Sequence, residues 1–239
     1  MNQDQLPDHV NPIGPGEPFS FLCHRKVSCF THCCRELELV LTPYDVLRLR
    51  RATGLPSAEL HRRYIIEEQS PDSIFPSFYL SMVDDGKARC VFVRPEGCSI
   101  YSDRPGACRT YPVGRAAIRN GEHVQEHFVL LRELHCRGFE ENTIQTVKSF
   151  MKSQELEPYN RFNDRLTEIT QHEKIRQGMV LSPEQIKQYK LALFDLDSFR
   201  DQLNNATTNQ LLDVSISVLE DDEALLEFGL SYIKKLLFD

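Results

Sequence analysis

The chain has 239 residues, of which 41% are hydrophobic and 26% charged, enough to form a buried core and too apolar for disorder over most of its length. Its 28 basic and 35 acidic residues give a net charge of −7, which argues against a general nucleic-acid binder. No apolar stretch approaches the roughly 20 residues of a membrane helix, and the N-terminus lacks the pattern of a secretion signal. We therefore expect a cytoplasmic protein.

The first part of the chain is predicted to be irregular. Residues 1–20 are polar and rich in proline and glycine, which is typical of a tail without regular structure. Residues 21–34 contain four cysteines and show neither helical nor alternating periodicity. This segment is interpreted as a loop wrapped around a site.

Two helices are predicted next. Thr42 is a favourable N-cap and Pro43 a favourable first helical residue, and Gly54 should end this helix. A second helix is predicted from a cap at Ser57 to about Glu68.

Two β-hairpins follow in the predicted order. The first turns at residues 84–87, between strands expected at 75–83 and 88–93. The second turns at Asn120-Gly121, the strongest hairpin signal in the chain, with strands expected within residues 113–132.

The rest of the chain is predicted to be helical, and the whole to have an α+β fold. Four helices are expected, at residues 143–153, 156–173, 183–203 and 221–238. We accordingly predict a small cysteine-rich half with short hairpins, followed by a helical C-terminal half. The predicted regions are an irregular tail at 1–20, a cysteine-cluster metal-binding domain at 21–140 and a helical region at 141–239.

The distribution of cysteines is the strongest functional signal. All eight lie in the first 136 residues, and the remaining 103 residues contain none. A reducing cytosol would not preserve four structural disulfides, although an exported chain could form them. Metal ligation or thiol chemistry is therefore the leading interpretation. The candidate metal ligands are Cys23, Cys29, Cys33, Cys34, Cys90, Cys98, Cys108 and Cys136.

Eight thiols could fill one four-ligand site or two. Tetrahedral zinc takes four thiolate or imidazole ligands, and an iron–sulfur cluster takes four thiolates. We expect the adjacent Cys33 and Cys34 not to reach the same ion, because neighbouring side chains of extended backbone point to opposite faces. Three histidines next to cysteines could replace a thiolate on zinc, although exposed loop histidines are the commoner alternative: His24, His32 and His135.

Positive charge next to the cysteines is the second signal. Four thiolates around Zn²⁺ or an oxidised [4Fe–4S] core leave a formal charge of −2, which nearby cations stabilise. Four arginines stand beside cysteines in the sequence: Arg35, Arg89, Arg109 and Arg137. Chance placement among 28 basic residues is the alternative.

The spacing of these residues resembles a known family. Over residues 20–140 the chain is similar to the YkgJ-type cysteine-cluster family of proposed zinc- or iron-chelating domains. The flagellin lysine methylases resemble the same module, in which an iron–sulfur cluster is thought to be held. Three blocks carry the resemblance: Cys29-x3-Cys33-Cys34, then Cys90-x7-Cys98-Ser-Ile-Tyr101-x2-Arg104-Pro105-x2-Cys108-Arg109-x-Tyr111-Pro112, then Cys136-x-Gly138.

These observations predict a metal-binding protein whose cysteines hold an iron–sulfur cluster, in the form [4Fe–4S], or zinc. A redox role or one coupled to a modification reaction would follow from the cluster. The alternatives are a zinc-stabilised protein-interaction module and an enzyme related to the methylases, although the chain has no glycine-rich cofactor loop and no assignable catalytic residue. We expect a protein partner to bind the helical C-terminal half, and neither nucleic acid nor membrane to be bound.

Overall fold

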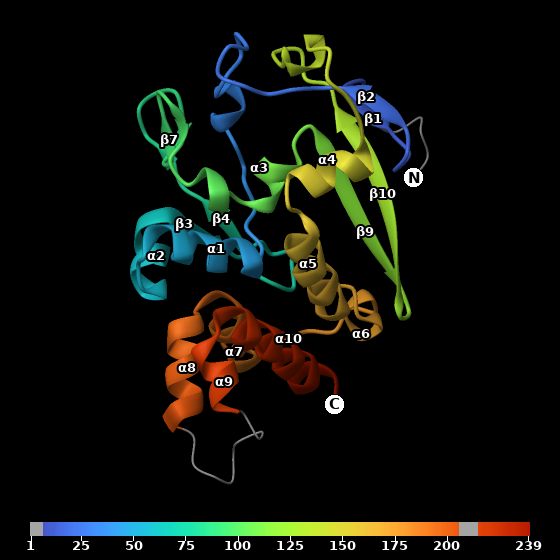
Figure 1. Cartoon of the computed structure of the whole chain (residues 1–239). Helices are drawn as coiled ribbons and strands as arrows, with labels where there is room; N and C mark the ends of the chain where they lie inside the picture. Colours follow the sequence, from blue (N-terminus) through green and yellow to red (C-terminus); the bar gives the residue numbers. More distant parts are fainter. Residues whose placement is uncertain (1–6, 206–214) are drawn as a thin grey trace. The chain divides into compact units, whose positions relative to one another are not determined.

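The computed structural model describes residues 7–205 and 215–239 and divides into two compact units (Figure 1). Unit 1 comprises the chain up to Leu39 together with Met82–Asn160, and unit 2 comprises Val40–Ser81 together with the chain from Arg161 onward. Each unit is therefore built from two separate segments. All eight cysteines belong to unit 1. The three regions expected from the sequence, 1–20, 21–140 and 141–239, remain a prediction.

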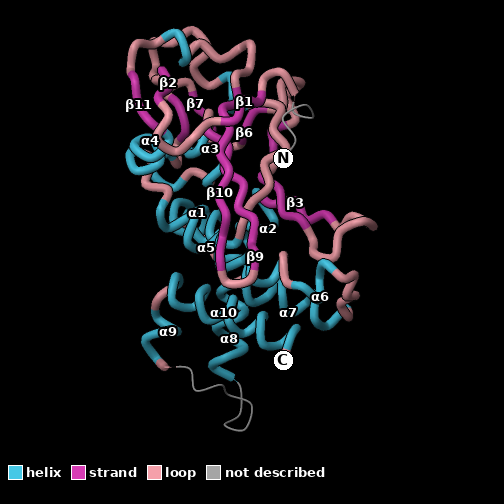
Figure 2. The backbone as a smooth tube through the Cα atoms, turned by 90° about the vertical axis from the view of Figure 1, so that its right-hand side faces the viewer, coloured by secondary structure: helices cyan, strands magenta, loops and turns pink. Residues whose placement is uncertain are grey.

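The largest sheet of unit 1 is antiparallel and has the strand order β1-β10-β9 (Figure 2). The long hairpin of β9 (Val113–Asn120) and β10 (His123–Leu131) turns as the sequence predicts, with Asn120 opposite His123. Gly121 adopts a φ of 62° in this turn, a conformation that glycine tolerates without steric cost. Strand β1 (Val10–Pro12) pairs with β10, so part of the segment expected to be irregular is a short strand.

The other strands of unit 1 are two or three residues long and form three antiparallel pairs. These are β2 (Pro18–Ser20) with β11 (Ile144–Thr146), β5 (Met82–Val83) with β6 (Arg89–Cys90), and β7 (Val93–Arg94) with β8 (Gly97–Cys98). The β5–β6 pair is the predicted first hairpin in a shorter form. Helices complete the unit: η2 (His32–Cys34), η3 (Tyr101–Asp103), α3 (Gly106–Thr110), η4 (Gly138–Glu140) and α4 (Val147–Ser153).

A small apolar core supports these short elements. Its buried members come from the N-terminal segment, both hairpin strands and α4, and are Ile13, Phe19, Phe21, Val113, Leu130, Val147 and Phe150. Phe21 stands at its centre, with its ring edge-on to those of Tyr111, Phe139 and Phe150. The core therefore reaches directly to the segment that carries Cys136.

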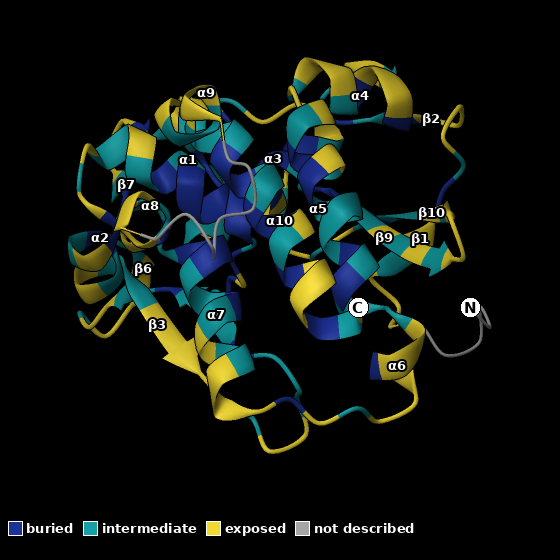
Figure 3. Ribbon diagram, turned by 90° about the horizontal axis from the view of Figure 1, so that it is seen from below, coloured by how far each residue is buried: buried dark blue, intermediate teal, exposed yellow. Residues whose placement is uncertain are grey.

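Unit 2 is mainly helical, as the pattern of the C-terminal half predicts. Its elements are α1 (Pro43–Thr53), α2 (Ser57–Tyr64), β3 (Ile65–Glu68), β4 (Ser77–Leu80), α6 (Glu173–Arg176), α7 (Pro183–Phe194), α8 (Leu196–Asn205), α9 (Ile216–Glu220) and α10 (Asp222–Phe238), with α5 (Glu157–Thr170) beginning in unit 1. Figure 3 shows α1 largely buried and β3 exposed. Helix α1 confirms the predicted capping, because Thr42 and Asp45 form a capping box and Gly54 ends the helix at φ 65°.

Several predicted elements differ from the structure. The helix predicted from residue 143 begins only at Val147, because Ile144–Thr146 form β11. The second helix ends at Tyr64 because the β-branched Ile65 and Ile66 join a strand paired with β4. The predicted helix 183–203 is two helices, since Asp195 leaves helical geometry with φ −127° and ψ 72°. Pro105 and Gly106 stand in the sequence at positions that favour a type II turn, but the structure has a 3-10 turn, η3, followed by α3. Cys108 therefore lies on a short helix.

Among residues 7–205 and 215–239, no helix combines the length and the apolar character that crossing a membrane requires.

Candidate metal centre

Five of the eight cysteines gather where two irregular segments of unit 1 meet. Cys23 and Cys29 lie in the loop after β2, and Cys33 and Cys34 form the end of η2. Cys136 lies in the turn between β10 and η4. All eight cysteines are free thiols, so none of them is held in a disulfide.

The thiols of Cys23, Cys29, Cys33 and Cys136 act on one another electrostatically, and we call these four the first cysteine group. The pKa of Cys23 is raised to about 11. Burial is the main cause, and the negative charges that Cys33, Cys29 and Cys136 would carry add to it. The pKa of Cys33 is raised by its hydrogen bond with Cys34 and by burial. Four thiolates crowded here without a cation would repel one another, which is the electrostatic condition that a bound metal ion relieves.

Two further contacts surround the first cysteine group. The backbone N–H of Arg137 donates to Sγ of Cys29 at 3.1 Å, and such hydrogen bonds to sulfur tune thiolate centres. The hydroxyl of Tyr111 is buried next to Cys136 and has no partner at hydrogen-bond distance among the described residues. Burial raises the pKa of Tyr111, so this hydroxyl, which has both Cys136 and Glu133 near it, stays protonated.

Cys90, Cys98 and Cys108 belong to other elements of unit 1, and we call them the second cysteine group. Cys90 ends β6 and Cys98 ends β8, and burial together with the charge of Cys98 raises the pKa of Cys90. Cys108 is exposed on α3. Cys98 and Cys108 both act on Arg104, because the negative charge of either thiolate would stabilise its guanidinium.

The sulfurs of the first cysteine group do not form a metal coordination site in this structure. Within the described part of the chain, no three Cys, His, Asp or Glu side chains converge closely enough to hold a metal ion. The donor chemistry nevertheless fits a thiolate-bound metal, because four thiols, one N–H donor and an orphaned buried hydroxyl share one region.

The three candidate histidines make the following contacts in the structure. Nδ1 of His24 accepts the N–H of Lys26 at 3.1 Å, and its Nε2 lies 3.3 Å from Glu141. Nε2 of His135 lies 3.7 Å from Glu133, and the His135 ring centroid is 6.3 Å from that of His32. The first cysteine group is thus described by its thiols, with these histidines at its sequence borders.

The arginines predicted to stand near sulfur separate into two kinds. Arg89 pairs with Asp85, and Arg137 with Glu140, so these two cations are neutralised at the surface. Arg109 is buried, at 3% exposure. The sequence interpretation missed Arg104, which is also buried and whose charge acts on Cys23 and Cys98. Its position in the Arg-Pro pair of the second block was the available signal.

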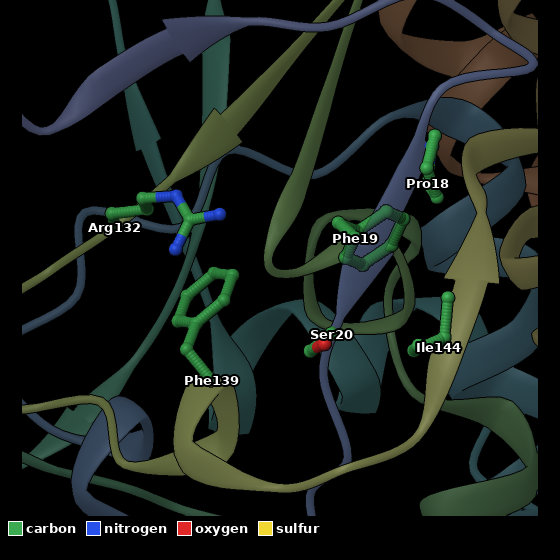
Figure 4. Close-up of a pocket in the computed structure, with 6 residues that line it drawn as sticks. All are labelled: Pro18, Phe19, Ser20, Arg132, Phe139 and Ile144. Atoms are coloured by element: carbon green, nitrogen blue, oxygen red, sulfur yellow. The ribbon is translucent and has the colours of Figure 1, made fainter.

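Two hollows of about 450 Å³ each lie away from the sulfurs. The one in unit 1 is walled by Phe19 and Ile144, and the guanidinium of Arg132 stands 4.6 Å from the ring centroid of Phe139 (Figure 4). The one in unit 2 is lined mainly by apolar side chains, including Phe75. Neither is lined by a cysteine, so neither is the predicted metal site.

A comparison with protein families identifies the family of this cysteine-rich chain. The model of the CxxCxxCC family, described as a "putative zinc- or iron-chelating domain", matches residues 22–155, which is more than half of the chain. The chain belongs to the CxxCxxCC family. The match confirms the resemblance seen in the sequence, and it includes every cysteine of both groups. A search of curated proteins and a search of solved structures found no match.

Membership of the CxxCxxCC family indicates that the cysteine-bearing unit chelates zinc or iron. The family match ends at residue 155, so most of unit 2 lies outside it. The chemistry of the family is therefore concentrated in the unit that holds the two cysteine groups.

Proposed function

We propose that the first cysteine group holds an iron–sulfur cluster of the [4Fe–4S] type, with Cys23, Cys29, Cys33 and Cys136 as its four thiolate ligands. One observation carries this proposal: these four thiols come from distant points of the chain into one electrostatic neighbourhood, with an N–H already donated to one sulfur. When bound, such a cluster supplies one-electron redox chemistry.

The residues around the group suit a centre of this kind. Phe21 packs edge-on against Tyr111 and Phe139, with ring centroids 6.4 and 5.2 Å away, and these rings exclude water from one side. The Arg137 N–H donates to Sγ of Cys29, and the buried Tyr111 hydroxyl lies beside Cys136. A cluster held mainly by irregular segments near the surface is accessible to an electron donor or acceptor. We place this redox function in the reducing cytoplasm, where thiolate ligands persist.

Zinc is the competing occupant. Four thiolates bind tetrahedral Zn²⁺ as readily as they bind a cluster, and zinc requires no assembly machinery. In that case the centre is structural and unit 2 is the candidate interaction module. The hollow lined by Phe75 and its apolar neighbours favours a protein partner there.

The second cysteine group supplies three thiols and would need a fourth ligand from elsewhere to hold a metal of its own. Cys34, hydrogen-bonded to Cys33, is the remaining thiol of the eight. We therefore propose one complete four-thiolate site, with these four cysteines outside its ligand set.

Anaerobic purification followed by metal, sulfide and spectral analysis tests the occupant. We expect broad visible absorption together with stoichiometric iron and acid-labile sulfide. A colourless protein with stoichiometric zinc would overturn the cluster and leave the ligand assignment standing. A protein that takes up neither metal, even after anaerobic reconstitution, would overturn the proposed function.

A further inference from the structure

The hollow of unit 1 is formed by three separate segments of the chain (Figure 4). They are β2, β11 and the stretch from the end of β10 to η4. The hollow measures about 450 Å³, within the range of roughly 300–1,000 Å³ that is typical of small-molecule sites. Its lining residues are all neutral or basic, and are Pro18, Phe19, Ser20, Arg132, Phe139 and Ile144. An anionic ligand would therefore meet no like charge on these walls.

Arg132 supplies a positive charge to the hollow. Its guanidinium lies 4.6 Å from the ring centroid of Phe139, and within residues 7–205 and 215–239 no carboxylate comes within ion-pair distance of it. Packing over an aromatic face engages the plane of a guanidinium and leaves the N–H groups along its edge, which are the groups that bind a carboxylate in pairs. The cation is thus positioned by the ring and keeps hydrogen-bond donors for a ligand.

Ser20 adds a second donor to the same hollow. Its hydroxyl makes no hydrogen bond in the part of the chain that the structure describes. Its position is fixed by the backbone, because Ser20 stands opposite Ile144 in the β2–β11 pair. A hydroxyl of this kind donates readily to the oxygen of an anion.

The remaining wall is apolar and reaches the surface. Figure 4 shows Phe19 and Ile144 on the side of the hollow away from Arg132. Phe19 is 4% exposed and belongs to the core, whereas Ile144 is 72% exposed. Covering an exposed isoleucine with hydrocarbon removes apolar surface from water and is favourable. The hollow is therefore complementary to a molecule with a negative charge at one end and an apolar body at the other.

We propose that this hollow binds a small apolar carboxylate, a free acid whose anionic end pairs with Arg132 and whose hydrocarbon part covers Ile144. A single guanidinium serves one charged group, so a monocarboxylate fits better than an acid with two charges. This site lies outside the proposed ligand set of the metal, and the inference does not depend on which metal the cysteines hold.

The test titrates octanoate into the full-length protein, purified anaerobically with its metal, and measures binding by ligand-observed NMR. Two matched probes accompany it: 1-octanol lacks the charge, and butanoate lacks half of the chain. The wild type should bind octanoate about 10-fold more tightly than either probe, because each probe loses one of the two complementary contacts. Equal affinity for octanoate and 1-octanol would overturn the inference, as would equal affinity for octanoate and butanoate.

Variants of the two walls should lose different parts of this selectivity. Arg132→Gln should weaken octanoate binding by about 10-fold and leave 1-octanol binding unchanged, since it removes a charge-assisted hydrogen bond. Arg132→Lys should weaken octanoate by only about 3-fold, because it keeps the charge and loses the planar fork. Ile144→Ser should weaken octanoate and 1-octanol alike, by about 3-fold, because it removes apolar contact area.

Arg94→Gln is the matched control for loss of charge. Arg94 of β7 is an exposed arginine of the same unit that donates to the carbonyls of Val91 and Val93 and does not line the hollow. Its octanoate affinity should equal that of the wild type. An equal loss in Arg94→Gln and Arg132→Gln would assign the binding to net charge alone and overturn the site.

Circular dichroism establishes that each variant is folded. If Arg132→Gln does not fold, Ile144→Ser decides, since an unchanged octanoate affinity in that variant overturns the proposed apolar wall. Tighter binding of a peptide that ends in leucine than of octanoate would overturn the assignment to a free acid. A wild type that binds octanoate but neither zinc nor iron would remove the proposed metal function and leave this inference standing.

Discussion

At the scale of single residues, Gly138 shows how closely the cysteine segments are packed. A Cβ atom at this position would lie 2.6 Å from Cε2 of Phe21 and 3.2 Å from the carbonyl oxygen of Leu22. Phe21 is 4% exposed and held among other aromatic rings, so it has little room to move. The N–H of Leu22 donates to the carbonyl of Gly138 at 3.0 Å, which joins the Cys23 segment to the Cys136 segment.

Gly138→Ala should therefore separate the two segments of the first cysteine group. We expect a loss of about 1–3 kcal/mol in the free energy of unfolding, the usual cost of overpacking, together with reduced metal content. Gly16→Ala is the control, since a Cβ at Gly16 meets no atom within 4 Å. Thermal melts and metal analysis of both variants measure the effect, and identical behaviour of the two would contradict it.

The ligand set makes a second residue-scale prediction. Cys136→Ser should lose bound metal because it removes one of four thiolates, whereas Cys34→Ser should keep it. Metal-to-protein ratios after anaerobic purification distinguish the two variants. Full occupancy in Cys136→Ser would exclude Cys136 from the ligand set.

At the scale of elements, an ion-pair network joins three helices of unit 2. Arg50 of α1 contacts Asp197 of α8 at 2.6 Å and Asp222 of α10 at 2.8 Å. Arg200 contacts the same two carboxylates, at 3.2 and 2.6 Å. Burial alone would raise the pKa of Asp197, but the hydrogen bonds from Arg50 and from the N–H of Ser57 outweigh it and hold this pKa below its ordinary value of 3.8.

The network predicts how the stability of unit 2 depends on pH. A carboxyl whose pKa is lower in the folded than in the unfolded state contributes stability that is present above the unfolded value and lost as the pH falls through the folded one. Unit 2 should therefore lose this contribution below about pH 4. Asp197→Asn should be less stable than wild type at pH 7, and the difference should shrink at pH 3. Urea unfolding monitored by circular dichroism at both pH values measures this, and a pH-independent difference would refute it.

Helices and hairpins with strong local sequence signals were predicted correctly. Thr42, Pro43 and Gly54 specify α1 through their own backbone preferences, and Asn120-Gly121 does so for the long hairpin. The strand at Ile65 was missed because the helical pattern of the preceding residues is overridden by pairing with β4, which follows after residues 69–76. Local pattern could not reveal this pairing.

The sequence predicted that the cysteines form a metal site, but not which of them lie together. The spacing of the cysteines indicates metal chelation, which the family match supports. The association of Cys136 with Cys23 depends on the packing of Phe21 against Phe139, which no motif encodes. The buried state of Arg104 was equally hidden, since its partner Gln154 lies 50 residues away in sequence.

At the scale of the whole molecule, removal of the metal should affect the two units differently. Unit 1 holds its cysteines in irregular segments, where ligation energy becomes folding energy, while unit 2 has a helical core of its own. We expect a chelator to make residues 21–39 and 131–143 sensitive to protease and to leave the helices from α7 to α10 protected. Limited proteolysis with mass spectrometry measures this, and an unchanged cleavage pattern and melting temperature would count against it.

The surface charge of the molecule supports the expectation that it does not bind duplex nucleic acid. Arginines cluster in the sequence of α1 and α2, but Arg50 pairs with Asp197 and Arg51 with Glu223. Arg62 and Arg63 both pair with Glu59. We expect no submicromolar binding to random duplex DNA or RNA at physiological salt in a fluorescence anisotropy titration, and salt-dependent binding at that level would contradict this.

The division of each unit into two chain segments has a consequence for synthesis. Cys23, Cys29 and Cys33 leave the ribosome before residues 40–81, which belong to the other unit, and Cys136 follows only after these have been made. A nascent chain can thus offer at most three of the four proposed sulfurs until more than half of it has been made. Metal insertion is accordingly expected only after Cys136 has left the ribosome, and an expression clone that stops near residue 135 would yield a protein unable to complete its centre.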